Sequence, residues 1–176
     1  AYMGRGVAYA NLGEFKHAIE DCDQAIKLNP QFAGSYLNRG AVYAMLGEYE
    51  RAEEEYDKAI TINPKFSLAY YNRGLVYANL GEFKRSIEDY EQAIKIDSQF
   101  SESYYARGLS YANLDEFKRS IENYDQAISI NPKFSLAYYN RGLAYANLGE
   151  FKHSIEDYDQ AIKINSQLAE AYSGRG

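Results

Sequence analysis

The sequence lacks any long apolar run. No stretch approaches the roughly 18–20 apolar residues that a membrane-spanning helix needs, and charged residues make up 25% of the chain. No targeting segment is visible at the N-terminus. We therefore expect a soluble, cytoplasmic protein without a membrane partner.

Positive charge is also in short supply. Lys and Arg together number 19 against 25 Asp and Glu, which gives a formal net charge of −6. Proteins that bind nucleic acid rely on Lys and Arg to neutralise phosphates. The charge balance therefore argues against nucleic acid as a partner.

Residues with metal-binding or redox chemistry are scarce. Cys22 is the single cysteine and cannot form an internal disulfide, so we expect a packed thiol. His17 and His153 are the two histidines, and neither has a second ligand at metal spacing. No motif supplies a nucleophile with its base, a paired catalytic carboxylate or a phosphate loop. The sequence thus predicts a protein that is not an enzyme and has no cofactor or metal site.

What the chain does contain is a period of 34 residues. Its clearest markers are Tyr36, Tyr70, Tyr104 and Tyr138, each followed four residues later by glycine. Complete copies span residues 33–66, 67–100, 101–134 and 135–168, with partial copies at 1–32 and 169–176. This period indicates an array of stacked repeats and not a globular domain with an enclosed cavity of its own. Because both ends fall inside a copy, we interpret residues 1–176 as a single array that is a piece of a longer one.

Repeat positions are numbered here from 1 at residues 33, 67, 101 and 135, and local signals divide each copy into two helices. Leu68–Leu80 is followed by Gly81, which supplies the left-handed conformation that ends a helix. Phe83–Ile96 is the expected second helix. Asp115 replaces that glycine in the next copy, and Asp is among the few other residues that tolerate this conformation. The sequence predicts an all-α chain of helix pairs.

The residue types at seven repeat positions resemble the tetratricopeptide repeat (TPR) family. Tyrosine lies at position 4, glycine at 8, tyrosine at 11, Ala or Ser at 20, an aromatic residue at 24, alanine at 27 and, in several copies, proline at 32. The resemblance covers the whole chain. It implies an α-solenoid of antiparallel helix pairs, in which the first helix of each pair lines a concave groove and the second faces outward.

Helical spacing separates two faces of the first helix. Positions 3, 4, 8, 10, 11 and 14 form the face that we expect to be packed, together with the aromatic residue at position 24 of the second helix. The opposite face carries tyrosine, leucine and asparagine instead of Lys and Glu, which is typical of an interaction site. The candidate groove residues are Tyr71, Tyr105 and Tyr139 at position 5, Asn38, Asn72 and Asn140 at position 6, and Leu75, Leu109 and Leu143 at position 9. The tyrosines and leucines can also pack between neighbouring first helices, and the two roles are compatible.

The asparagines at position 6 carry the functional hypothesis. A carboxamide offers both a donor and an acceptor, so it can hold a peptide backbone without reading side chains. The pattern resembles the asparagine ladder of one branch of the TPR family, which holds extended substrates by their main chain, although Ala106 interrupts it here. The lysine clamp of another branch, which binds chaperone C-terminal carboxylates, is absent. The predicted function is a protein–protein interaction scaffold that binds an extended peptide segment in its groove.

Two alternatives remain open at this point. The chain could be an architectural or self-assembling segment without a dedicated peptide ligand, or the regulatory arm of a larger enzyme. The half-length helix expected at Ala169–Arg175 presents the same type of surface that would precede residue 1 in a longer array. We therefore also expect end-to-end association between copies of the chain.

Arginine at position 7 departs from the family pattern, which has leucine there. The four arginines of the complete copies are Arg39, Arg73, Arg107 and Arg141. They fall inside the packed face, where a guanidinium without a partner is costly. Position 23 of the second helix carries an acid in most copies, with Asn123 as the exception. We expect a ladder of internal ion pairs with Asp89 and Asp157 as the leading partners, and an anion-binding role is the alternative.

Overall fold

Ten helices make up the part of the chain that the computed structural model describes, residues 2–168 and 171. The first helices of successive repeats are α1 (Tyr2–Asn11), α3 (Ala33–Met45), α5 (Ser67–Asn79), α7 (Ser101–Asn113) and α9 (Ser135–Asn147). The second helices are α2 (Phe15–Leu28), α4 (Tyr49–Ile62), α6 (Phe83–Ile96), α8 (Phe117–Ile130) and α10 (Phe151–Ile164). These residues contain no strand, so the all-α prediction is confirmed. The eleventh, half-length helix expected at Ala169–Arg175 lies, apart from Ala171, outside the described residues.

The turn between the two helices of a repeat has the expected left-handed residue. Gly81 has a φ of 76°, and the Glu82 amide donates to the Tyr77 carbonyl at 2.8 Å, which closes the end of α5. Asp115 adopts the same conformation with a φ of 59°, as its short polar side chain allows. The predicted boundaries are correct for Phe83–Ile96 and differ by one residue at each end for α5.

From α3–α4 onward, the second helix of each pair carries a buried tyrosine at the centre of the packing. Tyr56, Tyr90, Tyr124 and Tyr158, all at position 24, are almost completely buried. The rings of Tyr56, Tyr124 and Tyr158 lie against the glycine at position 8 of the first helix in the same repeat. A Cβ atom at Gly108, for example, would lie 2.6 Å from Cε1 of Tyr124. The glycine is therefore required by the close approach of the ring and not by its backbone conformation.

The predicted packed face needs two corrections. The tyrosines at position 11, such as Tyr77 and Tyr111, are buried as expected, but those at position 4, such as Tyr104, are only half-buried. The prediction for position 14 is wrong in most repeats, since Leu80 is 39% exposed. Leu80 follows the last residue of α5, so the chain turns away from the core before its side chain can pack.

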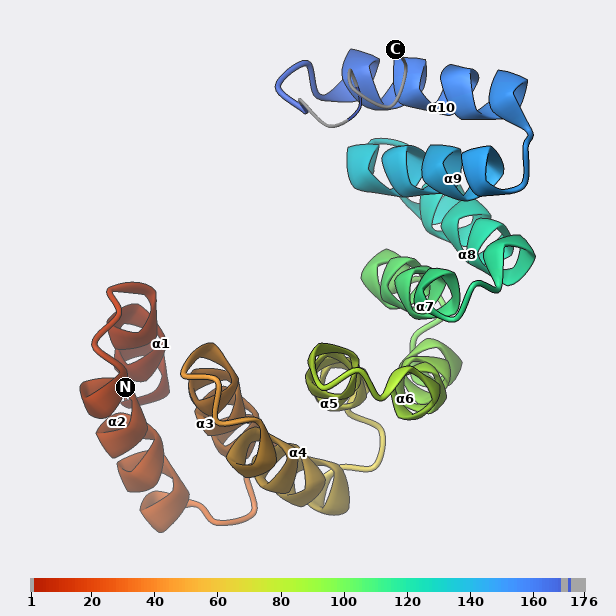
Figure 1. Ribbon diagram of the computed structural model, residues 1–176. Helices are drawn as coiled ribbons and strands as arrows, with labels where there is room; N and C mark the ends of the chain where they lie inside the picture. The colour runs from red at the N-terminus through yellow and green to blue at the C-terminus, as the bar shows by residue number, and fades with distance from the viewer. Residues whose placement is uncertain (1, 169–170, 172–176) are drawn as a thin grey trace. The chain divides into compact units, whose positions relative to one another are not determined.

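The chain divides into two compact units, unit 1 (Ala1–Glu82, α1–α5) and unit 2 (Phe83–Gly176, α6–α10). Within each unit, consecutive helices pack side by side as pairs, such as α3 with α4 and α9 with α10 (Figure 1). The first helices of neighbouring repeats also touch one another, α1 with α3, α3 with α5, and α7 with α9. The face of the first helices that carries positions 5, 6 and 9, where the sequence predicts a groove, is called the inner face below. None of the described helices has the length and apolarity needed to cross a membrane.

Candidate functional site

Two pockets open between neighbouring first helices at equivalent repeat positions. The α7–α9 pocket has a volume of about 280 Å³ and is lined by Leu109, Ala112, Asn113, Phe117, Tyr124, Asn140, Leu143, Ala144 and Asn147. The α1–α3 pocket has a volume of about 210 Å³ and is lined by Gly6, Val7, Ala10, Asn11, Cys22, Asn38, Ala41, Val42 and Met45. Both draw on positions 9, 12, 13 and 24 of one repeat and on positions 6, 9, 10 and 13 of the next. The recurrence makes them a feature of the repeat itself.

The structure brings together several of the predicted groove residues. Asn140, Leu109 and Leu143 line the α7–α9 pocket, and Asn38 lines the α1–α3 pocket. The three predicted residues on α5 are Tyr71, Asn72 and Leu75, which are half-buried and line neither of these two pockets.

Asn140 is fixed in place by two hydrogen bonds from its side-chain amide. Its Nδ2 donates to the Tyr105 hydroxyl at 3.0 Å and to the Leu136 carbonyl at 2.9 Å. Both amide hydrogens are therefore used inside the protein, and Oδ1 is the remaining hydrogen-bonding atom of this side chain. Asn38 has no equivalent anchor, because the position-5 residue of the preceding repeat is Met3, which has no hydroxyl. The predicted asparagines are thus not equivalent.

The tyrosines at position 5 pack against the core and also reach the inner face. The ring centroid of Tyr105 lies 4.7 Å from that of Phe134 and 5.9 Å from that of Tyr124. Tyr139 lies 5.8 Å from Tyr158 in the same way. Both tyrosines remain half-buried, so a packing role accounts for part of each side chain and leaves the rest accessible.

Position 24 forms a wall of both pockets but differs in its chemistry. Tyr124 is fully buried, and neither its hydroxyl nor that of nearby Ser120 makes a hydrogen bond of acceptable geometry among the described residues. Burial raises the pKa of Tyr124 above its usual value. Cys22 replaces the tyrosine in the α1–α3 pocket, and burial raises the pKa of its thiol to about 11, so the thiol is neutral. This agrees with the packed thiol expected for Cys22.

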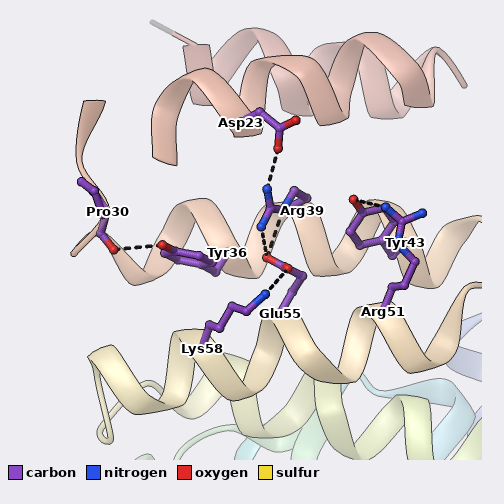
Figure 2. A network of polar contacts seen from close by, with 8 residues as sticks. All are labelled: Asp23, Pro30, Tyr36, Arg39, Tyr43, Arg51, Glu55 and Lys58. Carbon is purple, nitrogen blue, oxygen red and sulfur yellow. Dashed lines mark hydrogen bonds and ion pairs between the residues drawn. The ribbon is translucent and has the colours of Figure 1, made fainter. Parts of the chain in front are cut away.

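Arg39 lies at the centre of a polar network between α2, α3 and α4 (Figure 2). Its Nη2 and Nε contact one carboxylate oxygen of Glu55 at 2.7 and 3.0 Å, and its Nη1 contacts Asp23 at 2.5 Å. Lys58 also contacts Glu55, at 2.9 Å. The guanidinium thus pairs with position 23 of its own repeat and with position 25 of the preceding one.

The same arrangement, called a rung below, recurs along the chain. Arg141 contacts both oxygens of Asp157 at 2.6 and 2.8 Å and Asp125 at 2.5 Å. Arg5 contacts both oxygens of Asp21, and Arg73 contacts Asp57 at 2.5 Å. Arg107 differs, as it bonds to the neutral Asn123 at 2.7 Å and lies 3.7 Å from Glu91. Asp89, the other predicted leading partner, remains a prediction.

The acids at position 25 were missed by sequence reasoning. Asp23, Asp57, Glu91 and Asp125 recur every 34 residues, so the periodic signal was present. Helical geometry within one repeat gives no reason to pair them with the arginine of the next repeat. Only the stacking of helices shows that these acids link successive repeats.

Tyrosines at position 11 are covered by a cation or a histidine from position 19. Arg51 lies over Tyr43, with its guanidinium carbon 3.8 Å from the ring centroid, and Arg119 lies over Tyr111 at 4.5 Å. His153 occupies the same place over Tyr145, with ring centroids 5.1 Å apart.

No group of three or more His, Cys, Asp or Glu side chains that could hold a metal ion occurs among the described residues.

Comparison with known proteins identifies the family. A tetratricopeptide repeat model matches residues 1–32, 67–100 and 135–168, a TPR repeat model matches 45–81 and 114–149, and a further tetratricopeptide repeat model matches 22–54. The chain therefore belongs to the tetratricopeptide repeat family. Among curated proteins, none matches the chain significantly.

Solved structures of similar fold agree with this assignment. A crystal structure of MamA is 27% identical, with a TM-score of 0.82 over 94% of this chain and 96% of that chain. MamA from Desulfovibrio magneticus RS-1 is 18% identical, with a TM-score of 0.82 over 95% and 94%. YrrB is 22% identical, with a TM-score of 0.79 over 99% and 90%. The fold is thus a TPR solenoid, and fold and family together indicate a protein-interaction scaffold.

Proposed function

We propose that this TPR chain binds an extended segment of a partner protein along the inner face of its first helices. The recurrence of one pocket at the same repeat positions, with the position-6 asparagine in its lining both times, is the observation that carries the proposal. An extended chain rises about 3.3 Å per residue, so its side chains can enter successive pockets while its backbone follows the groove. Asn38, Asn72 and Asn140 would hold that backbone.

The geometry of Asn140 refines how the backbone is held. Because both of its amide hydrogens are used inside the protein, Asn140 can accept a hydrogen bond through Oδ1 but cannot donate one. It therefore takes a backbone N–H of the partner. Leu109 and Leu143, which line the same pocket, would supply apolar contact. Leu75 and the tyrosines Tyr71, Tyr105 and Tyr139 would extend this contact, and tyrosine is a favoured residue at binding hot spots.

One neighbour of similar fold supports a peptide ligand. The structure of YrrB is described as that of a TPR protein with an unusual peptide-binding site. Its identity to this chain is 22%, so the likeness supports the shared fold and not a shared ligand. The alternative of a purely architectural segment draws on the packing of Tyr105 and Tyr139 against the core.

Selection from a random library of 12-residue peptides displayed on phage tests the proposal. We expect enriched peptides whose binding shifts the methyl resonances of Leu109 and Leu143 and weakens in the Asn38→Ala/Asn140→Ala variant. Lys118→Ala, an exposed residue on α8, is the matched control and should leave binding unchanged. Peptides that bind the variant as tightly as the original chain would remove the inner face from the mechanism and favour the architectural alternative.

A further inference from the structure

Three asparagines give the α7–α9 pocket a lining rich in hydrogen-bond acceptors. Asn113, Asn140 and Asn147 each donate Nδ2–H to the backbone carbonyl four residues earlier, in each case at 2.9 Å. Asn140 uses its second amide hydrogen on Tyr105. No hydrogen bond to any of the three Oδ1 atoms is found in the described part of the chain. Asn140 thus uses both of its amide hydrogens inside the protein and Asn113 and Asn147 use one each, whereas all three carbonyl oxygens are available to a ligand.

Two helix ends add negative potential at the same place. Asn113 is the last residue of α7 and Asn147 the last residue of α9, and both line the pocket. The C-terminus of a helix carries the partial negative charge of the helix dipole, which favours a cation. Neither helix has a basic residue in its last turn that would neutralise this charge.

The pocket contains no side-chain charge of its own. Its nine lining residues are apolar or neutral polar, and the whole chain has a formal net charge of −6. A carboxylate or phosphate would face these acceptors, and only the second amide hydrogens of Asn113 and Asn147 are left as donors. A primary ammonium brings three donors and a positive charge, and a guanidinium brings five donors, so both fit this lining.

The α1–α3 pocket shows that this polarity is not common to every repeat. Position 13 of its second lining helix is Met45 instead of asparagine, and position 24 is Cys22 instead of tyrosine. The side chains of Asn11 and Asn38 make no hydrogen bond among the described residues, so their amide hydrogens are not used inside the protein. This pocket is mainly apolar and serves as an internal contrast.

We propose that the α7–α9 pocket binds a basic side chain, lysine or arginine, carried by the extended partner segment. The inference rests on the proposed function, because the bound backbone must bring the side chain to the pocket. It adds a selectivity that backbone capture lacks, since one residue of the partner is read by its charge. The pocket also fixes the register of the segment on unit 2.

Peptides selected from the random 12-residue library against the chain test this site. We expect the enriched peptides to share a lysine or arginine at one position. Replacement of that residue by norleucine, which keeps the aliphatic stem without the charge, should weaken binding at least about tenfold, as expected for hydrogen bonds to a charged group.

Two lysine substitutions at repeat position 13 locate the effect. Asn147→Lys places an ammonium of the protein's own at the α7–α9 pocket, so we expect the difference between the basic and norleucine peptides to fall below about twofold. Asn11→Lys makes the same change at the α1–α3 pocket and should keep the full difference. Circular dichroism and thermal unfolding verify that both variants are folded.

The outcomes separate this inference from the proposed function. A selection that enriches no peptide would overturn the proposed function and the inference together. Peptides that bind the inner face without a shared basic residue, or whose norleucine forms bind equally well, would overturn the inference alone. Equal effects of Asn147→Lys and Asn11→Lys would also overturn it, because the basic residue would then lie elsewhere.

Discussion

The helix pairs α7–α8 and α9–α10 have nearly the same packing but different electrostatics. In α9–α10, Arg141 meets two carboxylates, with a two-pronged contact to Asp157. In α7–α8, Arg107 has the same 19% exposure but bonds to the neutral Asn123 and lies 3.7 Å from the nearest carboxylate oxygen. Two residues make this difference: Asn123 replaces the acid at position 23, and Glu91 at position 25 lies farther from its arginine than Asp125 does.

The comparison shows that the rung has two separate functions in the solenoid. The contact at position 23 joins the two helices of one repeat, and the contact at position 25 joins that repeat to the preceding one. Loss of the acid at position 23 leaves the fold intact because Asn123 still accepts a hydrogen bond from Arg107 and donates one to the Arg119 carbonyl at 2.7 Å. The side chains at positions 7 and 23 are hydrogen-bonded to each other in both pairs, but only in α9–α10 is the position-23 partner of the arginine a carboxylate.

Removal of the arginine should give the largest difference in unfolding free energy between the two helix pairs. Arg141→Ala leaves the carboxylate of Asp157, which is 6% exposed, without its cation. We expect this to lower the free energy of unfolding by about 3–5 kcal/mol, as for other broken buried pairs. Arg107→Ala leaves the neutral Asn123 amide with an unpaired oxygen and should cost about 1–2 kcal/mol. Urea unfolding followed by circular dichroism measures both, and equal losses would contradict the comparison.

Replacement of the glycine at position 8 should affect both pairs alike. A Cβ at Gly108 would lie 2.6 Å from the ring of Tyr124, and one at Gly142 would lie 2.8 Å from the ring of Tyr158. Because both rings are fully enclosed, each Gly→Ala variant should lose about 1–3 kcal/mol of unfolding free energy. A difference of more than about 1 kcal/mol between them would show that the two pairs differ in packing as well as in charge.

The Asn123→Asp substitution should convert the weaker rung into the stronger kind. A carboxylate at this position would pair with Arg107 by a charge-assisted bond, which is stronger than the present one, although the bond to the Arg119 carbonyl would be lost. We expect a gain of about 0.5–1 kcal/mol in unfolding free energy at pH 7. In this variant Arg107→Ala should cost as much as Arg141→Ala does in the original chain, which a double-mutant cycle measures directly.

The smallest expected effect is the acid sensitivity of the rung in the first helix pair. Two hydrogen bonds from Arg5 hold the pKa of Asp21 below its usual value. A lowered folded-state pKa gives stability that is present above the unfolded value, about 3.9, and is lost as the pH falls through the folded value. Asp21→Asn should therefore flatten the decline of the urea midpoint below about pH 4. An unchanged pH profile would show that the pair contributes nothing.

Much of this fold followed from local patterns. The 34-residue period, the glycine at the turn and the aromatic residue at position 24 predicted helix pairs with boundaries that differ from the structure by at most one residue in α5 and α6. Asp115 was recognisable because its left-handed conformation depends on its own side chain and backbone. Leu80 was assigned to the core wrongly, and the tyrosines at position 4 are only half-buried although Tyr36 packs against the core. Spacing gives the direction of a side chain but not how far a neighbouring helix covers it.

The candidate site depended more heavily on tertiary structure. Asn140 was predicted to be a groove residue and lines the α7–α9 pocket, but its loss of donor capacity requires Tyr105, which lies 35 residues earlier and on another helix. The partnership of Arg141 with Asp125 likewise crosses from one repeat to the next. The sequence by itself determined the repeat, the helices and their amphipathic faces, because these depend on propensities and spacing within about 34 residues. Only the tertiary structure decided which acids contact each arginine and which atoms of Asn140 are used in internal hydrogen bonds, because those depend on side chains that stacking brings together.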